Sequence, residues 1–228
     1  MNPKVSVLLP TYNRADYIER AIESYLEQDY KNTELIVLND NSTDNTKEVL
    51  EKYNEHPRII IWHSDVNMSP PNNQNFLWEI ATGDLVCQLH DDDALTKDSI
   101  SKRVALFKPE TQVVWGGAIL QNIHGDRQGL FSGQEPDKNR ILKDEYINFT
   151  TLMYQRDLPF KFDGTLRYYF DWLFKIRCLN ECVCAYTPDP VMYYSMHEGQ
   201  ESSIARATGV NPIQDQLMRL KLIELGYR

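Results

Sequence analysis

VSVLLPTYNRADYIERAIESYLEQDYKNTELIVLND, residues 5–40, is the stretch that decides the fold. It opens with a short apolar run that ends at Pro10 and closes with a second one, ELIVLND; both are typical of buried strands. Between them, apolar residues recur at helical spacing from Asp16 to about Gln28. A strand, a helix and a strand in this order predict a right-handed crossover between two parallel strands.

The alternation of helix and strand continues outward from this unit. It predicts an α/β fold with a Rossmann-like, mostly parallel sheet flanked by helices, in one compact domain. The next elements we expect are a helix within residues 41–53, a strand at 58–64, a helix at 72–82 and a strand at 84–90. Beyond Thr111 we expect a strand at 112–120, helical periodicity over 162–179, and a C-terminal helix from Pro212 with one apolar stripe: Ile213, Leu217, Leu220 and Ile223.

Composition excludes several classes of protein. The chain has 228 residues and a net charge of -9, which argues against a general nucleic-acid-binding face; a local basic patch and peripheral membrane contact stay open. No stretch approaches the roughly 20 apolar residues of a membrane span, and we expect no signal peptide at the start because the apolar run before Pro10 is too short for one. We expect a soluble, cytoplasmic protein with no transmembrane segment. The four cysteines fit neither a disulfide framework nor a paired zinc motif, and we expect buried free thiols.

Polar clusters follow three of the predicted strands. They are TYNR at 11–14, NDNS at 39–42 and HDDD at 90–93. Ligands of such sheets bind beyond the carboxyl ends of the strands. The three segments are therefore expected to meet at one crevice.

Asp91, Asp92 and Asp93 are adjacent carboxylates that need a reason to tolerate one another. Two like charges about 4 Å apart repel by roughly 1 kcal/mol in water and by several times more in a dry crevice. One interpretation is a solvated turn in which Asp93 caps the next helix. The other is a divalent cation, Mg²⁺ or Mn²⁺, held by one or two carboxylates and completed by water and substrate phosphate oxygens.

A nucleotide would have to be held by side chains, because the chain contains neither G-x-x-x-x-G-K-[ST] nor G-x-G-x-x-G. Tyr12 can stack on a base, or be an ordinary half-buried aromatic residue. Asp40 can accept a hydrogen bond from the imide of uracil, or form an Asx turn before the next helix.

Together these motifs resemble the inverting family 2 glycosyltransferases of the GT-A fold. The likeness is close over residues 4–110, where the opening strand–helix–strand unit and ATGDLVCQLHDDDAL match, and looser beyond. It implies that Thr11, Tyr12 and Asp40 hold the nucleobase. It also implies that Asp92 contacts ribose or phosphate and Asp93 binds Mg²⁺ or Mn²⁺. The remaining residues assigned to the nucleotide sugar are Pro10, Arg14 and Asp91.

The chain departs from the family pattern at several positions. Asn39 and His90 replace acids and Gln74 replaces an arginine, and whether His90 or Asp91 helps to bind the metal stays open. In FDGTLRYYFDWLFKIR the likeness makes Asp171 the general base; pairing with Lys175 at i+4 is the alternative. In YYSMHEGQESS it makes His197 a candidate third metal ligand, or else a structural histidine.

The resemblance implies a metal-dependent, inverting transfer of sugar from a nucleotide diphosphate sugar, a UDP-sugar, to an acceptor hydroxyl in glycan biosynthesis. Residues 1–110 would form the nucleotide-sugar-binding half, and 111–228 the acceptor half with the C-terminal, acceptor-side helical region. The Gly-rich segment 122–140 is either a lid or a plain surface insertion. Alternatives are a nucleotidyltransferase and a non-catalytic nucleotide-sugar-binding module. The donor sugar and the acceptor are not predicted.

Overall fold

The computed structural model describes residues 2–200 and 212–227. Its first half alternates strands and helices, as expected from the apolar pattern. The four strands pair in parallel in the order β3-β2-β1-β4. The elements are β1 (Val5–Thr11), α1 (Ile18–Leu26), β2 (Thr33–Asn39), α2 (Thr46–Glu51), β3 (Ile59–His63), α3 (Pro70–Ile80) and β4 (Leu85–Gln88).

The second half extends the same sheet with mixed pairing. Among the described residues the sheet has nine strands, in the order β3-β2-β1-β4-β8-β6-β9-β5, with β7 on β6. β8 runs antiparallel to β4 and β6, whereas β6 and β9 are parallel. The elements are β5 (Ala94–Leu95), α4 (Ser99–Val104), β6 (Val113–Asn122), β7 (Arg127–Phe131), the 3-10 turn η1 (Phe149–Thr151), β8 (Met153–Gln155), α5 (Phe170–Glu181), β9 (Cys184–Met196) and α7 (Pro212–Glu224).

The α/β fold with flanking helices is thus confirmed, and the sheet is mixed beyond β4. A tight turn explains part of the difference. Gly125, with φ of 87°, turns the chain back, and its N–H donates to the Asn122 carbonyl at 3.0 Å. A turn this short makes a hairpin, so β7 pairs antiparallel with β6. Part of the Gly-rich segment 122–140 is therefore strand.

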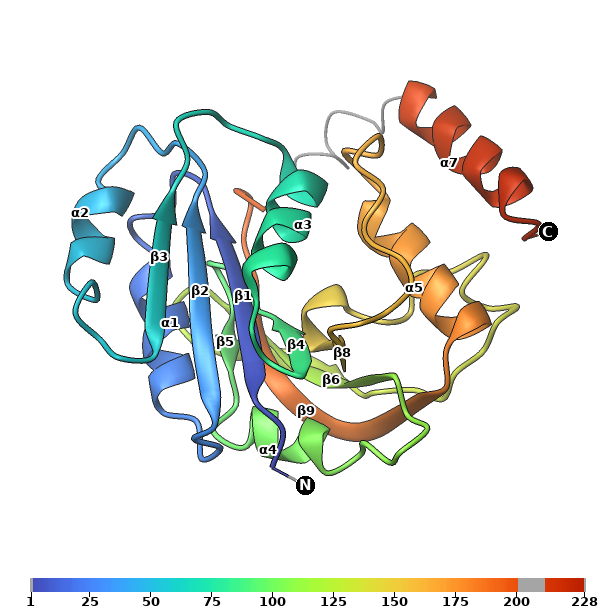
Figure 1. Cartoon of the computed structure of the whole chain (residues 1–228), viewed down its shortest axis with the longest axis horizontal. Coiled ribbons are helices and arrows are strands. Elements are labelled where there is room, and N and C mark those ends of the chain that lie inside the picture. The colour runs from blue at the N-terminus through green and yellow to red at the C-terminus, as the bar shows by residue number, and fades with distance from the viewer. Residues whose placement is uncertain (1, 201–211, 228) are drawn as a thin grey trace.

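Alternating side chains divide the core between the two faces of the sheet. Val7 and Leu9 of β1 pack with Ile18 and Ile22 of α1, whereas Leu8 packs with the α3 cluster around Trp78. Successive strand residues point to opposite faces, so one strand serves both clusters. Figure 1 shows the result, with β1, β2 and β3 side by side and helices on both sides of them.

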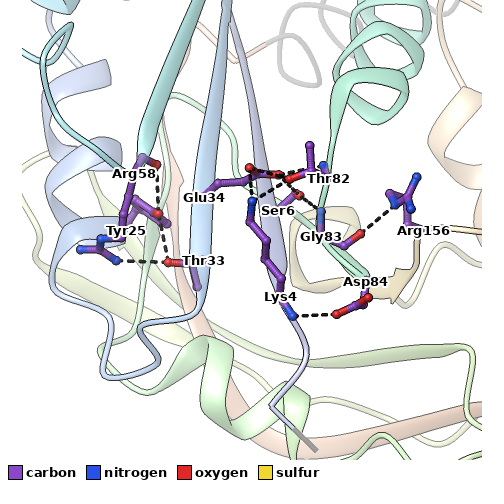
Figure 2. A network of polar contacts seen from close by, with 10 residues as sticks. All are labelled: Lys4, Ser6, Tyr25, Thr33, Glu34, Arg58, Thr82, Gly83, Asp84 and Arg156. Atoms are coloured by element: carbon purple, nitrogen blue, oxygen red, sulfur yellow. Dashed lines mark hydrogen bonds and ion pairs between the residues drawn. The ribbon is translucent and has the colours of Figure 1, made fainter.

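A polar network joins the amino-terminal ends of these strands. The Glu34 carboxylate accepts hydrogen bonds from Ser6 Oγ at 2.6 Å, the Thr82 N–H at 2.8 Å and the Lys4 ammonium at 2.6 Å (Figure 2). A Cβ at Gly83 would lie 2.7 Å from the Ser6 nitrogen, so only glycine fits there. The network fixes β1, β2 and the end of α3 to one another at the edge opposite the polar loops.

Two helices of the second half differ in detail from expectation. The helix expected within 162–179 begins at Phe170, because Asp163 instead accepts a hydrogen bond from the Thr165 N–H at 2.9 Å and forms a turn. α7 does begin at Pro212. Its predicted stripe faces outward in part: Ile213 and Ile223 are 66% and 70% exposed, while Met218 is buried against the core.

All four cysteines are free thiols, with Cys87 and Cys178 buried and the other two half-buried. Within the described residues, we find no helix with the length and apolar character that crossing a bilayer requires.

Candidate active site

The C-terminal ends of β1, β2 and β4 lie next to one another at one end of the parallel strands. The Asp40 N–H, just after β2, donates to the Thr11 carbonyl at the end of β1, at 2.9 Å. On the other side of β1, the Leu89 N–H, just after β4, donates to the Leu8 carbonyl at 3.0 Å. The loops that carry TYNR, NDNS and HDDD therefore leave the sheet together.

The loop after β4 carries a cluster with the chemistry of a cation site. Ligand atoms of His90, Asp92 and Asp93 all lie within 4.8 Å of one another. Asp93 is fully buried; its Oδ1 accepts the Ser195 N–H at 2.9 Å, and its Oδ2 has no hydrogen-bond partner among the described residues. Burial and the neighbouring Asp92 charge raise the pKa of Asp93 well above its usual value. An unpaired buried carboxylate oxygen of this kind fits a bound cation.

Arg20 and Ser195 hold this cluster in place from outside. The Arg20 guanidinium donates to the Asp92 carbonyl at 2.6 Å and to the Ser195 hydroxyl. The sequence gives no signal for this role. Arg20 is an ordinary polar residue of an amphipathic helix, and its partner Ser195 lies 175 positions away.

Asp91 points to a different set of partners. Its Oδ1 lies 3.5 Å from the Arg14 Nε. Burial and the Asp92 charge raise the pKa of Asp91 to about 7, against the lowering effects of Arg14 and the Thr11 hydroxyl. Geometry therefore groups His90, rather than Asp91, with Asp92 and Asp93.

His197 lies beside the cluster without being one of its three members. Its Nε2 is 3.0 Å from Asp92 Oδ2, and its ring stacks on Tyr17 with centroids 5.1 Å apart. The pairing with Asp92 fixes the imidazole near the acidic loop. Metal ligation by His197 stays a prediction, and Glu201, Ser202 and Ser203 of its motif lie outside the described residues.

The residues predicted to hold the nucleotide lie at the ends of β1 and β2. Pro10 is half-buried and Thr11 buried, whereas Tyr12 is 45% exposed and so presents a ring for stacking. Asp40 is buried, and its two oxygens already accept the Met68 N–H at 2.8 Å and the Asn73 amide at 2.7 Å. Asp40 thus fixes the segment that leads into α3. A nucleobase that binds Asp40 must therefore donate to the remaining lone pairs of its carboxylate oxygens.

Asp171 lies in the first turn of α5, where it forms the i+4 ion pair that was the alternative interpretation. Its Oδ2 is 3.0 Å from the buried Lys175 ammonium. Burial alone would raise the pKa of Asp171, but the Lys175 charge holds it below its usual value. Lys175 also contacts Glu145.

Phe149 connects the start of α5 to the acidic loop. Its ring centroid lies 5.9 Å from those of His90 and Phe170, and 6.0 Å from the Lys175 ammonium. The Phe149 ring therefore contacts both the acidic loop, through His90, and the start of α5, through Phe170. Neither Phe149 nor Glu145 is part of a recognisable motif.

A mixed α/β sheet with an acidic loop at its carboxyl edge is the architecture of the GT-A glycosyltransferases. Residues 6–169 match the family described as Glycosyl transferase family 2, and the chain belongs to that family. The predictions of the GT-A fold and of a family 2 glycosyltransferase are thereby confirmed.

Among curated relatives, the Escherichia coli putative colanic acid biosynthesis glycosyl transferase WcaA is 35% identical over 96% of this chain and 76% of its own. A Campylobacter jejuni relative, GalNAc(5)-diNAcBac-PP-undecaprenol beta-1,3-glucosyltransferase, is 32% identical over 64% of this chain. The chain spans about half of that relative's length, 48%.

Two solved structures share the fold. Staphylococcus aureus TarS 1-349 in complex with UDP-GlcNAc superposes with a TM-score of 0.78 at 23% identity, covering 97% of this chain and 66% of TarS 1-349. The Pyrobaculum calidifontis mannosyltransferase PcManGT, with GDP-Man and Mn²⁺, has a TM-score of 0.71 at 17% identity, covering 96% and 64% of the two chains.

Proposed function

We propose that the protein transfers a sugar from a nucleotide diphosphate sugar, a UDP-sugar, to an acceptor hydroxyl with inversion at the anomeric carbon, as a step in glycan biosynthesis. The observation that carries the proposal is the buried Asp93 Oδ2, unpartnered within the described residues and grouped with His90 and Asp92. Family membership and the UDP-GlcNAc and GDP-Man complexes of the two solved relatives support it.

His90, Asp92 and Asp93 would hold the cation, Mg²⁺ or Mn²⁺. When bound, the cation supplies charge neutralisation for the departing diphosphate. The PcManGT complex with Mn²⁺ supports this assignment by likeness of fold. Arg20 orients the loop by donating a hydrogen bond to the Asp92 carbonyl. This contact fixes the carboxylates of Asp92 and Asp93 in position before the substrate binds.

The chain's other residues would bind the donor and take up the proton. The exposed Tyr12 ring stacks on the base, and Asp40, held by Met68 and Asn73, faces the base edge. Asp171 accepts the proton of the acceptor hydroxyl while that oxygen attacks the anomeric carbon. A single in-line attack inverts the configuration there, and most of the rate gain comes from positive charge placed at the leaving group and from alignment of the two reactants.

The two halves of the chain divide these tasks. Residues 1–110 carry the cation cluster and the base-binding side chains, so we assign donor binding to this half. Residues 111–228 carry Asp171 and its partners, so we assign the acceptor to this half. The β6–β7 hairpin within this half is a candidate lid.

A panel of nucleotide sugars followed by ³¹P NMR tests the proposal without knowledge of the acceptor. The expected result is Mn²⁺-dependent release of UDP from at least one UDP-sugar, since water can take the place of the hydroxyl. Binding of UDP-sugars with no release in the presence of added glycan acceptors would instead indicate a non-catalytic nucleotide-sugar-binding module.

A further inference from the structure

Asp171 is one member of a cluster of three charged groups at the start of α5. The Lys175 ammonium lies 3.0 Å from Asp171 Oδ2 and also donates to Glu145 Oε1. The Lys175 side chain is 1% exposed, whereas the side chains of Asp171 and Glu145 are 26% and 45% exposed. The ammonium is therefore enclosed, while the two carboxylates remain within reach of a molecule outside.

The charges of this cluster do not balance when both acids are ionised. Two carboxylates against one ammonium leave a net negative charge in a partly dry site, and one shared proton removes it. Asp171 and Glu145 both accept hydrogen bonds from the Lys175 ammonium, so their carboxylates are neighbours. Burial and the Asp171 charge raise the pKa of Glu145 to about 7, although Lys175 opposes this. The carboxylate pair of Asp171 and Glu145 thus binds one proton below about pH 7 and loses it above that pH.

We propose that Asp171 and Glu145 act together as the proton acceptor for the attacking hydroxyl, with Lys175 holding the two carboxylates in place. The inference rests on the proposed transfer reaction and deepens it. Glu145 adds a second residue to the base that family resemblance assigns to Asp171 alone.

The proton and electron balance is as follows for a pair that starts without its shared proton. The acceptor oxygen forms a bond to the anomeric carbon, and the bond from that carbon to the diphosphate oxygen breaks, its electron pair leaving with the diphosphate. The hydroxyl proton moves to Asp171 and is then shared with Glu145. After product release the pair returns this proton to water. A base that titrates near the working pH is the most effective one.

The other titratable groups facing the pair keep their charge over this range. Carboxylate contacts outweigh burial and raise the pKa of Lys175, so it stays protonated. Burial and a hydrogen bond to Asp215 raise the pKa of Tyr169 to about 12, so it stays neutral. The uncharged Phe149 ring also lies nearby, 6.0 Å from the Lys175 ammonium.

The test is the pH dependence of kcat/KM for nucleotide-sugar turnover from about pH 5 to pH 9. The wild type should lose activity as the pH falls through about 7, where Glu145 gains its proton. In Glu145→Gln this acid limb should move down by more than about one pH unit, and the plateau should fall about tenfold or more, because Asp171 beside Lys175 is a weaker base.

Glu181→Gln is the matched control, since Glu181 lies on the same helix and pairs with Arg177 at 2.9 Å. It should keep both the limb and the plateau of the wild type. An acid limb in Glu145→Gln that coincides with that of the wild type would overturn the proposal.

A second measurement needs neither turnover nor a stable variant at Glu145. In wild-type protein with ¹³C-labelled glutamate carboxyls, NMR should show one carboxyl that titrates near pH 7. This titration should move in Asp171→Asn. If no glutamate carboxyl titrates near pH 7, the pair does not share a proton and the proposal fails. A shared proton without turnover of any nucleotide sugar would refute the proposed function alone.

Discussion

Replacing Glu34 with glutamine should destabilise the fold without changing the residues of the candidate active site. Glu34 lies at the amino-terminal edge of the sheet, where its Oε2 accepts the Lys4 ammonium at 2.6 Å and its Oε1 accepts the Ser6 hydroxyl and the Thr82 N–H (Figure 2). Glutamine can keep the Oε1 contacts but turns an N–H₂ group toward Lys4. The variant therefore loses a charge-assisted hydrogen bond and gains a donor that faces another donor.

The structure sets the size of the effect. Losing a hydrogen bond between charged groups costs about 1.5–3 kcal/mol. The side chain of Glu34 is 7% exposed, but that of Lys4 is 38% exposed, so the ammonium recovers water. The full cost of breaking a buried ion pair, about 3–5 kcal/mol, is therefore not reached. We expect Glu34→Gln to lower the free energy of unfolding by about 2–3 kcal/mol at neutral pH.

The pH dependence gives a second check on the same variant. The hydrogen bonds from Lys4, Ser6 and Thr82 outweigh burial and hold the pKa of Glu34 below its ordinary value of 4.5. A lowered folded-state pKa contributes stability above the unfolded pKa, and this contribution is lost as the pH falls through the folded pKa. The difference between wild type and Glu34→Gln should thus be constant at neutral pH and shrink below about pH 4.5.

Urea unfolding followed by circular dichroism measures both quantities. Glu19→Gln is the matched control, because Glu19 pairs with Lys52 on the surface at 2.9 Å with both side chains more than half exposed. That pair should contribute less than about 1 kcal/mol. Equal losses in the two variants, or a Glu34→Gln loss that does not change between neutral and acid pH, would refute the reasoning.

Three further changes test the candidate active site. Asp171→Asn should lower turnover by about 10²- to 10⁴-fold and leave UDP affinity unchanged by calorimetry; retained turnover would remove Asp171 from the base. Tyr12→Ala should weaken UDP binding by about 1–3 kcal/mol if the exposed ring stacks on uracil, and an unchanged Kd would place the base elsewhere. Arg20→Met should weaken Mn²⁺ binding roughly 10- to 100-fold through the Asp92 loop; unaltered Mn²⁺ affinity would show that the loop holds its shape unaided.

The sequence was sufficient for the first half of the fold because local pattern and tertiary structure agree there. Each strand from β1 to β4 is a short apolar run, and helices lie between them, so pattern alone predicts parallel pairing. β9 was not predicted. Its run from Cys184 to Met196 contains two prolines, at 188 and 190, and its register against β6 shifts between Trp115 and Gly117 and again between Gly117 and Ala118. Pairing with β6, rather than the apolar pattern of residues 184–196, determines an irregular strand of this kind.

The site divides in the same way. The polar loops were predictable because each follows a strand end, and the topology of parallel strands brings such ends together. The supporting residues were not, because their partners are far away in sequence: Arg20 lies 72 positions from Asp92, and Glu145 lies 30 from Lys175. His90, which replaces an acid of the family motif, is one of the three members of the cation cluster.

The most direct test of the account is whether the acidic loop after β4 binds a divalent cation together with the nucleotide. Electron paramagnetic resonance of free Mn²⁺, titrated with protein in the presence and absence of UDP, measures this binding. We expect tight binding of Mn²⁺ with UDP, weakened at least about tenfold in Asp93→Asn. Asp98→Asn, which alters an acid paired with Lys102 near the same loop, should bind as the wild type does. Mn²⁺ binding that is the same with and without UDP, or the same in Asp93→Asn, would contradict the assignment.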